Sequence, residues 1–281
     1  MKKIFRTLYD LMTDEMARGR HISVLFRFIS LQIRFLFKTE YEFEWLEGLK
    51  IRAIRHWPGT TECYYYGKYD RSELTFLERY MDENMVLLDI GANIGSYSLY
   101  AVKKTGCKAI AVEPEPKTYA ELKNNIDINL LNDYITAFNC AVGDVTGRVR
   151  FTNNLDMSNH IVEDQDESGE NIIEVECRRL DDFITTGDVL KLDVEGVEAL
   201  ALCGAERLLS DNRLKVLIVE VIYNIEEIEA EIFKYGYKRC KYDYINNRLI
   251  SSDEESFERK GDNFFYVKDI DSVKKRVGKK V

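Results

Sequence analysis

The 281-residue chain has few of the residues from which metal sites and disulfide frameworks are built. Its three histidines, His21, His56 and His160, are too scattered for a histidine-rich metal site. Its six cysteines include no C-x-x-C pair, which is typical of reduced thiols in a protein core. We therefore expect no bound metal and a reducing compartment, the cytoplasm.

Long apolar runs are also missing. The N-terminus has no uninterrupted apolar run followed by a small-residue cleavage site, so no signal peptide is predicted. The most apolar stretch, residues 24–37, has fourteen residues and two internal arginines, which makes it too short and too charged to span a bilayer.

Positive charge is scarce outside the N-terminus. The net charge is −9, but residues 1–38 hold eight basic and three acidic side chains (+5), so residues 39–281 carry −14. An acidic body argues against a broad nucleic-acid footprint. The hydrophobic content of 45% and the charged content of 32% are ordinary for a soluble globular protein.

What the chain does contain is half of a nucleotide-binding unit at residues 85–104. A short apolar run (85–90) predicts a buried parallel strand, and a glycine turn (91–95) follows it. Residues 96–104, from Ser96 on, have apolar side chains at helical spacing. Strand, glycine turn and helix together predict the opening of a βαβ unit.

The turn indicates which nucleotide is bound. Asn93 stands where a dinucleotide fingerprint needs its second glycine, and Asp89, at the end of the strand, would repel a pyrophosphate. The same carboxylate would pair with the ammonium group of S-adenosylmethionine. Glu113 ends the next strand and is placed to accept hydrogen bonds from a ribose diol.

A third strand is predicted at residues 135–142, ending at Gly143-Asp144. Asp144 could accept a hydrogen bond from the adenine amino group; the alternative is a simple Gly-Asp turn. The cofactor-binding residues predicted are Asp89, Gly91, Asn93, Gly95, Ser96, Glu113 and Asp144.

The predicted catalytic residues follow the fourth strand, residues 189–194. Asp193 and Glu195 stand at its carboxyl end, where open α/β sheets bind their ligands. We expect Asp193 to act on an acceptor hydroxyl as base or as orienting group, with Glu195 in support. His160, in the polar loop 153–171, is the rival base. A divalent cation held by Asp193, Glu195 or Glu220 is the less favoured alternative, and Glu195 and Glu220 could instead have only structural roles.

Several motifs together resemble the FkbM family of class I, S-adenosylmethionine-dependent methyltransferases. They are DIGANIGSYSL from Asp89, VEPEP at 112–116, AVGD at 141–144, RRLDDF at 178–183 and LKLDVEGVEALALCGA at 190–205. The resemblance covers residues 63–222. The resemblance implies O-methylation of a hydroxyl on a sugar, a glycan or a related small molecule.

The alternatives to this function are a natural-product, protein or RNA methyltransferase and an inactive adenosylmethionine-binding module. No N-P-P-Y-like motif, typical of N-methylating enzymes, follows the fourth strand.

The expected fold is an α/β, Rossmann-like domain with a seven-stranded, mostly parallel sheet. A β-hairpin of residues 148–152 and 172–178 is inserted over the active-site face, and the last two strands are expected at 237–250 and 263–267. The predicted domains are an N-terminal helical extension with a β-hairpin (1–62), the catalytic domain (63–268) and a basic tail (269–281). Two strands are expected at 49–55 and 63–66, joined by a turn, and a helix is expected at 71–80.

The N-terminal region is predicted to be helical over residues 3–38, with one narrow polar stripe on an otherwise apolar helix. Three roles stay open: the helix covers the catalytic domain or a second subunit in a homo-oligomer, lies in a membrane interface, or lines the acceptor pocket. A membrane role would place the protein at the inner face of the membrane, and the basic tail would strengthen it. The tail could equally be a solvated end. The polar stripe consists of Ser23, Arg27, Ser30, Arg34 and Lys38.

Overall fold

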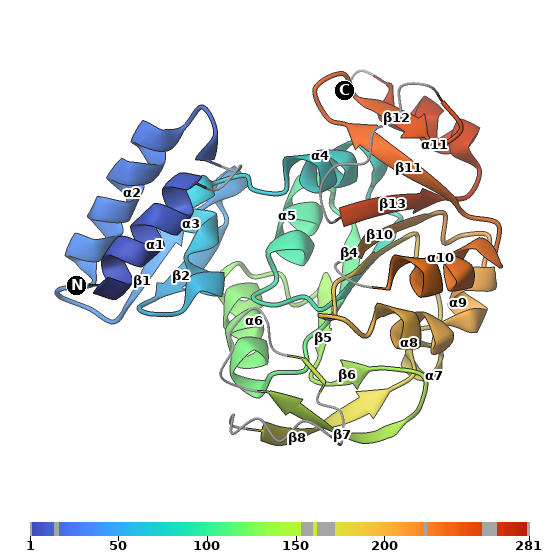
Figure 1. The fold of residues 1–281 in the computed structure, drawn as a ribbon, viewed down its shortest axis with the longest axis horizontal. Helices are drawn as coiled ribbons and strands as arrows, with labels where there is room; N and C mark the ends of the chain where they lie inside the picture. Colours follow the sequence, from blue (N-terminus) through green and yellow to red (C-terminus); the bar gives the residue numbers. More distant parts are fainter. Residues whose placement is uncertain are drawn as a thin grey trace. The chain divides into compact units, whose positions relative to one another are not determined.

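The computed structural model describes residues 2–13, 17–152, 160–161, 172–221, 224–254 and 263–279. The chain divides into two compact units, Met1–Arg71 and Ser72–Val281 (Figure 1). None of the helices within the described ranges has the length and apolar character needed to cross a membrane.

The first unit combines helices with a two-stranded sheet. The predicted helix over 3–38 is two helices, α1 and α2, and Gly19 between them has a left-handed backbone (φ 77°). β2 is present as predicted, but its partner is β1, whose E-Y-E-F-E alternation turns Phe43 inward. The elements are α1 (Lys2–Thr13), α2 (His21–Arg34), β1 (Glu40–Glu44), β2 (Lys50–Ile54) and α3 (Glu62–Tyr66), with 3-10 turns at Leu46–Gly48 and Pro58–Thr60.

The strand predicted at residues 63–66 is wrong. This segment is the helix α3, which buries Cys63, Tyr65 and Tyr66 and ends at Gly67 with φ 68°. Three consecutive tyrosines favour a strand locally, but packing in the core of the unit decides the outcome.

The second unit is built on an eight-stranded sheet in the order β12-β11-β13-β10-β9-β3-β4-β5. The five strands from β10 to β5 are parallel, and β13, β11 and β12 are joined antiparallel. The predicted α/β class is confirmed, but the sheet has one more strand than expected because residues 238–251 form a hairpin. The strands are β3 (Val86–Ile90), β4 (Lys108–Val112), β5 (Ile135–Phe138), β9 (Val189–Leu192), β10 (Val216–Glu220), β11 (Lys238–Asp243), β12 (Arg248–Ser251) and β13 (Asn263–Val267).

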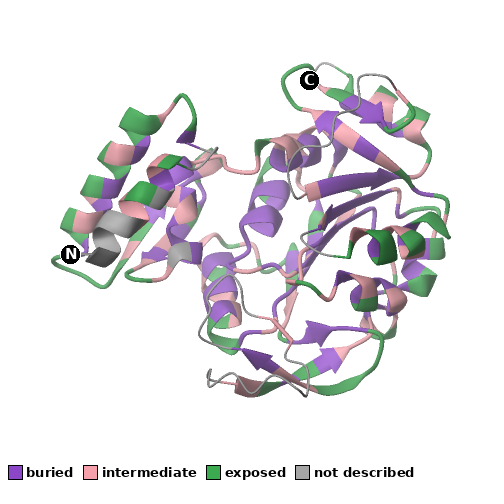
Figure 2. Ribbon diagram, in the orientation of Figure 1, coloured by how far each residue is buried: buried purple, intermediate pink, exposed green. Residues whose placement is uncertain are grey.

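Helices connect and cover these strands, most of which are coloured as buried in Figure 2. Val273 and Val277 of α11 are buried, so residues 270–277, predicted to belong to a separate tail, pack as part of this unit. The helices are α4 (Arg71–Tyr80), α5 (Ser96–Thr105), α6 (Pro116–Ile128), α7 (Leu180–Phe183), α8 (Glu198–Cys203), α9 (Glu206–Ser210), α10 (Ile225–Phe233) and α11 (Ile270–Val277).

A three-stranded sheet, β6-β8-β7, holds the predicted hairpin. β7 (Gly147–Thr152) and β8 (Ile172–Arg178) pair antiparallel, as expected. The single strand predicted at 135–142 is two strands, because β5 ends at Phe138 and β6 (Ala141–Val142) joins β8 in the small sheet.

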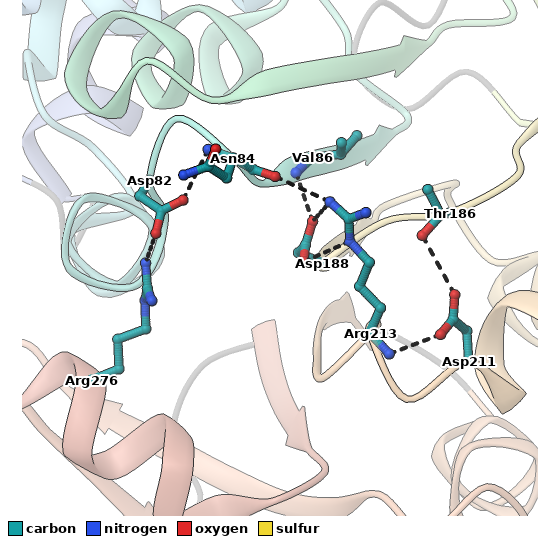
Figure 3. A network of polar contacts seen from close by, with 8 residues as sticks. All are labelled: Asp82, Asn84, Val86, Thr186, Asp188, Asp211, Arg213 and Arg276. Carbon is teal, nitrogen blue, oxygen red and sulfur yellow. Dashed lines mark hydrogen bonds and ion pairs between the residues drawn. The ribbon is translucent and has the colours of Figure 1, made fainter.

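The amino-terminal edge of the large sheet is fixed by paired charges (Figure 3). Asp188, just before β9, accepts hydrogen bonds from Arg213 Nε (3.0 Å) and Nη2 (3.0 Å) and from the Val86 N–H (2.8 Å). Asp82, before β3, pairs with Arg276 of α11. These contacts tie the starts of β3, β9 and β10 together.

Candidate active site

The carboxyl-terminal edge of the sheet gathers acidic side chains from four adjacent strands. Asp89 lies in β3, Glu113 follows β4, Asp193 follows β9, and Glu220 ends β10. β3, β9 and β10 pair in parallel, so these residues reach the same edge of the sheet.

The glycine turn after β3 is shaped by its contacts with the protein. A Cβ at Gly91 (φ 78°) would lie 1.7 Å from the backbone oxygen of Asp193. At Gly95 (φ 89°) it would lie 2.5 Å from Cδ1 of Leu122 in α6. Both glycines are therefore needed for the turn to fit between β9 and α6.

Asp89 is fully buried and anchors this turn to α5. One carboxylate oxygen accepts the Ser98 N–H (3.0 Å) and the Ser98 hydroxyl (2.6 Å). The other oxygen has no hydrogen-bond partner among the described residues. Burial raises the pKa of Asp89, and the ammonium of Lys191 opposes that shift. Ser96, the first residue of α5, is also buried.

Glu113 is buried and fixes the same turn from β4. Its carboxylate accepts the N–H of Asn93 (2.9 Å), which has a left-handed backbone (φ 48°), and the N–H of Glu115 (3.0 Å). Burial raises the pKa of Glu113 to about 8. Each oxygen keeps a second acceptor position, so two backbone bonds leave room for a ligand hydroxyl.

Lys191 is a site residue that the sequence analysis missed. It lies in the middle of β9, in register with Asp89, and its side chain is 5% exposed. Its ammonium group is 2.5 Å from a carboxylate oxygen of Asp193 and 4.9 Å from the centre of the Tyr97 ring. The nearby carboxylates raise the pKa of Lys191 against the effect of burial. A lysine inside the apolar run V-L-K-L was the available signal, because a buried ammonium needs a partner.

The three carboxyl groups around this lysine differ in proton affinity. Lys191 and a hydrogen bond from Glu220 hold the pKa of Asp193 below its usual range. Burial, and then the neighbouring Asp193, raise the pKa of Glu220 to about 9 and that of Glu195 to about 7. At neutral pH, Asp193 is ionised, Glu220 is protonated and Glu195 is close to its midpoint.

Carboxylate oxygens of Asp193, Glu195 and Glu220 lie within 4.8 Å of one another, close enough to hold a metal ion. An ammonium group already contacts one of them, and Glu220 carries a proton, so the cluster balances its charge without a cation.

Glu195 lies in a sharp turn between β9 and α8. Its backbone is left-handed (φ 55°), and Gly196 follows with φ 100°. The Glu198 side chain accepts the N–H groups of Val194 (3.3 Å) and Gly196 (3.0 Å) and so holds this turn in place. The half-buried carboxyl group of Glu195 is thus presented from a fixed backbone.

His160 lies within electrostatic range of Glu195 and lowers the pKa of that carboxyl group. Its backbone pairs with Thr152 at the end of β7, with His160 N–H to Thr152 Oγ1 at 2.9 Å. The rest of the acidic loop, residues 153–159 and 162–171, lies outside the described residues.

Asp144 does not end the third strand of the large sheet, so its predicted position is wrong. β5 stops at Phe138, because Asn139 turns the chain by donating to the backbone oxygens of Glu113 (2.9 Å) and Pro114 (3.0 Å). Asp144 follows β6 in the small sheet, is exposed, and lies within electrostatic range of Cys177 and Cys203.

Comparison with known proteins identifies the domain that carries this edge. Residues 89–242 match the family described as "Methyltransferase FkbM domain". The chain belongs to the FkbM methyltransferase family. The match begins at Asp89 and covers both the glycine turn and the cluster around Lys191. The predicted family and the predicted class I methyltransferase domain are confirmed.

Two curated relatives are similar over part of this FkbM chain. Methyltransferase sdnD of Sordaria araneosa is 28% identical over 161 residues, covering 45% of this chain and 62% of the relative. The 2-O-methyltransferase NoeI of Sinorhizobium fredii is 28% identical over 167 residues, covering 52% and 66%. The chain therefore spans less than two thirds of each relative.

Among solved structures, the methyltransferase FkbM of Methylobacillus flagellatus is similar at 17% identity and a TM-score of 0.48. The alignment covers 95% of this chain and 58% of that one.

The edge residues fit S-adenosylmethionine, the methyl donor of the family. The donor carries a sulfonium and an ammonium group, one carboxylate and no phosphate. At the edge, Lys191 pairs with Asp193 and Glu220 holds a proton, which leaves the carboxyl groups of Asp89 and Glu195 for a positively charged ligand. Asp89 also keeps a buried oxygen without a partner among the described residues, which is a site that an ammonium ligand would satisfy.

Proposed function

We propose that the protein transfers a methyl group from S-adenosylmethionine to a hydroxyl group of a sugar, a glycan or a related small molecule. Family membership supports methyl transfer, and a relative named as a 2-O-methyltransferase supports an oxygen acceptor. The observation that carries the proposal is the cluster of Lys191, Asp193, Glu195 and Glu220, which combines an ionised carboxylate with one whose pKa is near 7.

The role proposed for each acidic residue follows from its protonation state. Asp193 is held ionised and in place by Lys191 and by the protonated Glu220, so it orients the acceptor hydroxyl. Its lowered pKa makes it a weak proton acceptor. Glu195, with a pKa of about 7, takes the proton near neutral pH. His160 lowers the pKa of Glu195 and so favours its ionised form.

S-adenosylmethionine supplies an electrophilic methyl group when bound. The residues of the chain hold the donor and the acceptor in position. Asp89 and Glu113 are held by hydrogen bonds to Ser98 and to the turn backbone, so neither has to be ordered when ligand binds. Alignment of acceptor and donor of this kind is worth about 7–11 kcal/mol.

The test is a screen of saccharides and nucleotide sugars for release of S-adenosylhomocysteine, followed by Glu195→Gln on the best acceptor. We expect wild-type kcat/KM to rise with pH through about 7. Glu195→Gln should lower the rate by about 10²–10⁴-fold and abolish that rise. Glu226→Gln, at an exposed position in α10, serves as the matched control and should change neither.

Two outcomes would contradict the proposal. A wild-type rate and pH profile in Glu195→Gln would remove Glu195 as the base. Tight binding of S-adenosylmethionine without release of product from any hydroxyl acceptor would indicate a binding module or a different acceptor class.

A further inference from the structure

α2 carries two apolar faces, and only one of them is used inside its own unit. Val24, Phe28 and Leu31 are buried and pack in the core of the first unit. A second set of large apolar side chains lies on the other side of the helix and is between 46% and 83% exposed. This set consists of Ile22, Phe26, Ile29, Ile33, Leu36 and Phe37.

The spacing shows that these residues form one surface. Ile22, Phe26, Ile29 and Ile33 are separated by four, three and four positions, so they lie on one line along the helix. Leu36 and Phe37 extend it into the turn that follows. Figure 2 shows the exposed residues alternating with buried ones along α2. Single exposed apolar residues are normal on a protein surface, but a continuous stripe indicates a binding surface.

Residues 17–38, which comprise α2 and its flanks, carry charge of one sign, and the exposed glutamates of β1 begin beyond them at Glu40. Residues 17–38 contain five basic side chains and no acidic one, in a chain whose net charge is −9. Arg27 and Arg34 are directed toward the protein: Arg27 donates to the Tyr64 oxygen (3.3 Å), and Arg34 lies over the Tyr41 ring (4.1 Å). Arg18 and Lys38, one at each end of α2, are exposed.

We propose that α2 binds an anionic lipid surface, with its exposed apolar face in the headgroup region. A helix with an apolar face, flanking basic residues and no acids is the type that lies in the plane of a membrane interface. The absence of acids over residues 17–38 favours lipid over a second copy of the chain, because two such helices would repel each other. Basic residues near an anionic surface add about 1 kcal/mol each.

The experiment is co-sedimentation of the full chain with phosphatidylglycerol vesicles and, in parallel, with phosphatidylcholine vesicles. We expect binding to the anionic vesicles that weakens as salt is raised. Phe26→Ser/Ile33→Ser should reduce it by about tenfold or more. Lys38→Glu should reduce binding to anionic vesicles less, and only at low salt. The matched control is Ile245→Ser, an isoleucine that is 75% exposed in the other unit, and it should bind like wild type.

Three results would overturn the proposal. The first is failure of the wild-type chain to bind phosphatidylglycerol vesicles at low salt. The second is equal binding by Phe26→Ser/Ile33→Ser. The third is a dimer in sedimentation velocity that this double variant disperses, or a lowered melting temperature for it without vesicles, because either would show that protein already covers the face.

Discussion

The amino-terminal and carboxyl-terminal edges of the parallel sheet are formed by the same strands, but their carboxyl groups are paired in different ways. At the amino-terminal edge, the carboxylate of Asp188 accepts hydrogen bonds from Nε and Nη2 of Arg213. Asp82 pairs with Arg276, which lowers the pKa of Asp82. Bidentate arginine pairs of this kind fix the geometry of a carboxylate. This edge is built for stability.

At the carboxyl-terminal edge, no arginine contacts the acidic cluster among the described residues. Lys191 interacts electrostatically with several of its carboxyl groups. The pKa values of Glu113, Glu195 and Glu220 are all raised. Groups that titrate near neutral pH can exchange protons with a substrate. The three glutamates whose pKa values are raised toward or beyond neutrality therefore lie at the edge where we propose the chemistry.

The sharpest test of this comparison replaces one aspartate on each edge. We expect Asp193→Asn to lower turnover by about 10²–10³-fold with little change in affinity for S-adenosylmethionine, because the variant loses the charge that orients the acceptor. Asp188→Asn should leave turnover unchanged and lower the free energy of unfolding by about 1–3 kcal/mol, because it breaks the pair with Arg213. Steady-state kinetics and urea unfolding measure the two effects.

Asp193→Asn also leaves the buried Lys191 without its closest partner, so the variant could lose activity by unfolding. The double variant Lys191→Met/Asp193→Asn removes both charges and should recover stability but not turnover. Recovery of turnover in the double variant, or turnover of Asp193→Asn within a few-fold of wild type, would show that Asp193 has no role in the reaction.

A smaller difference, in affinity for S-adenosylmethionine, is expected between variants of Glu113 and Glu115. We expect Glu113→Ala to weaken binding of S-adenosylmethionine by about tenfold or more, because it removes the acceptor for the ribose hydroxyls and releases the Asn93 turn. Glu115→Ala should leave affinity within about twofold and lower the free energy of unfolding by about 1 kcal/mol, since Glu115 caps α6 through the Thr118 N–H (2.7 Å). Calorimetry of both variants decides it, and equal affinities would remove Glu113 from the cofactor site.

Much of the fold could be predicted because its signals are local. α4 is found with the predicted ends, and β3 and α5 differ from the prediction by one residue at one end. Apolar runs, a glycine turn and helical spacing are all properties of short segments. The strand predicted at 135–142 is split by a contact from Asn139 to residues 113 and 114, which lie far away in the sequence.

The positions of the acidic residues in the candidate site could be predicted from the sequence, but their electrostatic interactions could not. Asp89, Glu113, Asp193 and Glu195 could be placed because the ends of parallel strands meet at one edge. The contact of Lys191 with Asp193 and the proximity of His160 to Glu195 depend on side-chain direction and on closure of the β7-β8 hairpin. Neither is a property of a sequence pattern.

The smallest predicted effect is a difference in how stability depends on pH. The pKa of Glu220 is raised from 4.5 to about 9, so between these values the folded protein holds a proton that the unfolded chain has lost. Stability due to this group therefore falls as pH rises from 4.5 to 9. The pKa of Asp82 is lowered from 3.8, so its contribution is complete above about pH 5 and is lost only in acid.

We therefore expect the melting temperature of the wild type to fall between pH 6 and pH 8.5, and Glu220→Gln to reduce that fall by about 2–4 °C. Asp82→Asn, from the opposite edge, should shift the whole curve down without changing its slope in this range. Calorimetry across the pH range measures both. If Glu220→Gln keeps the wild-type slope while Asp82→Asn alters it, the assignment of the titrating protons to the carboxyl-terminal edge is wrong.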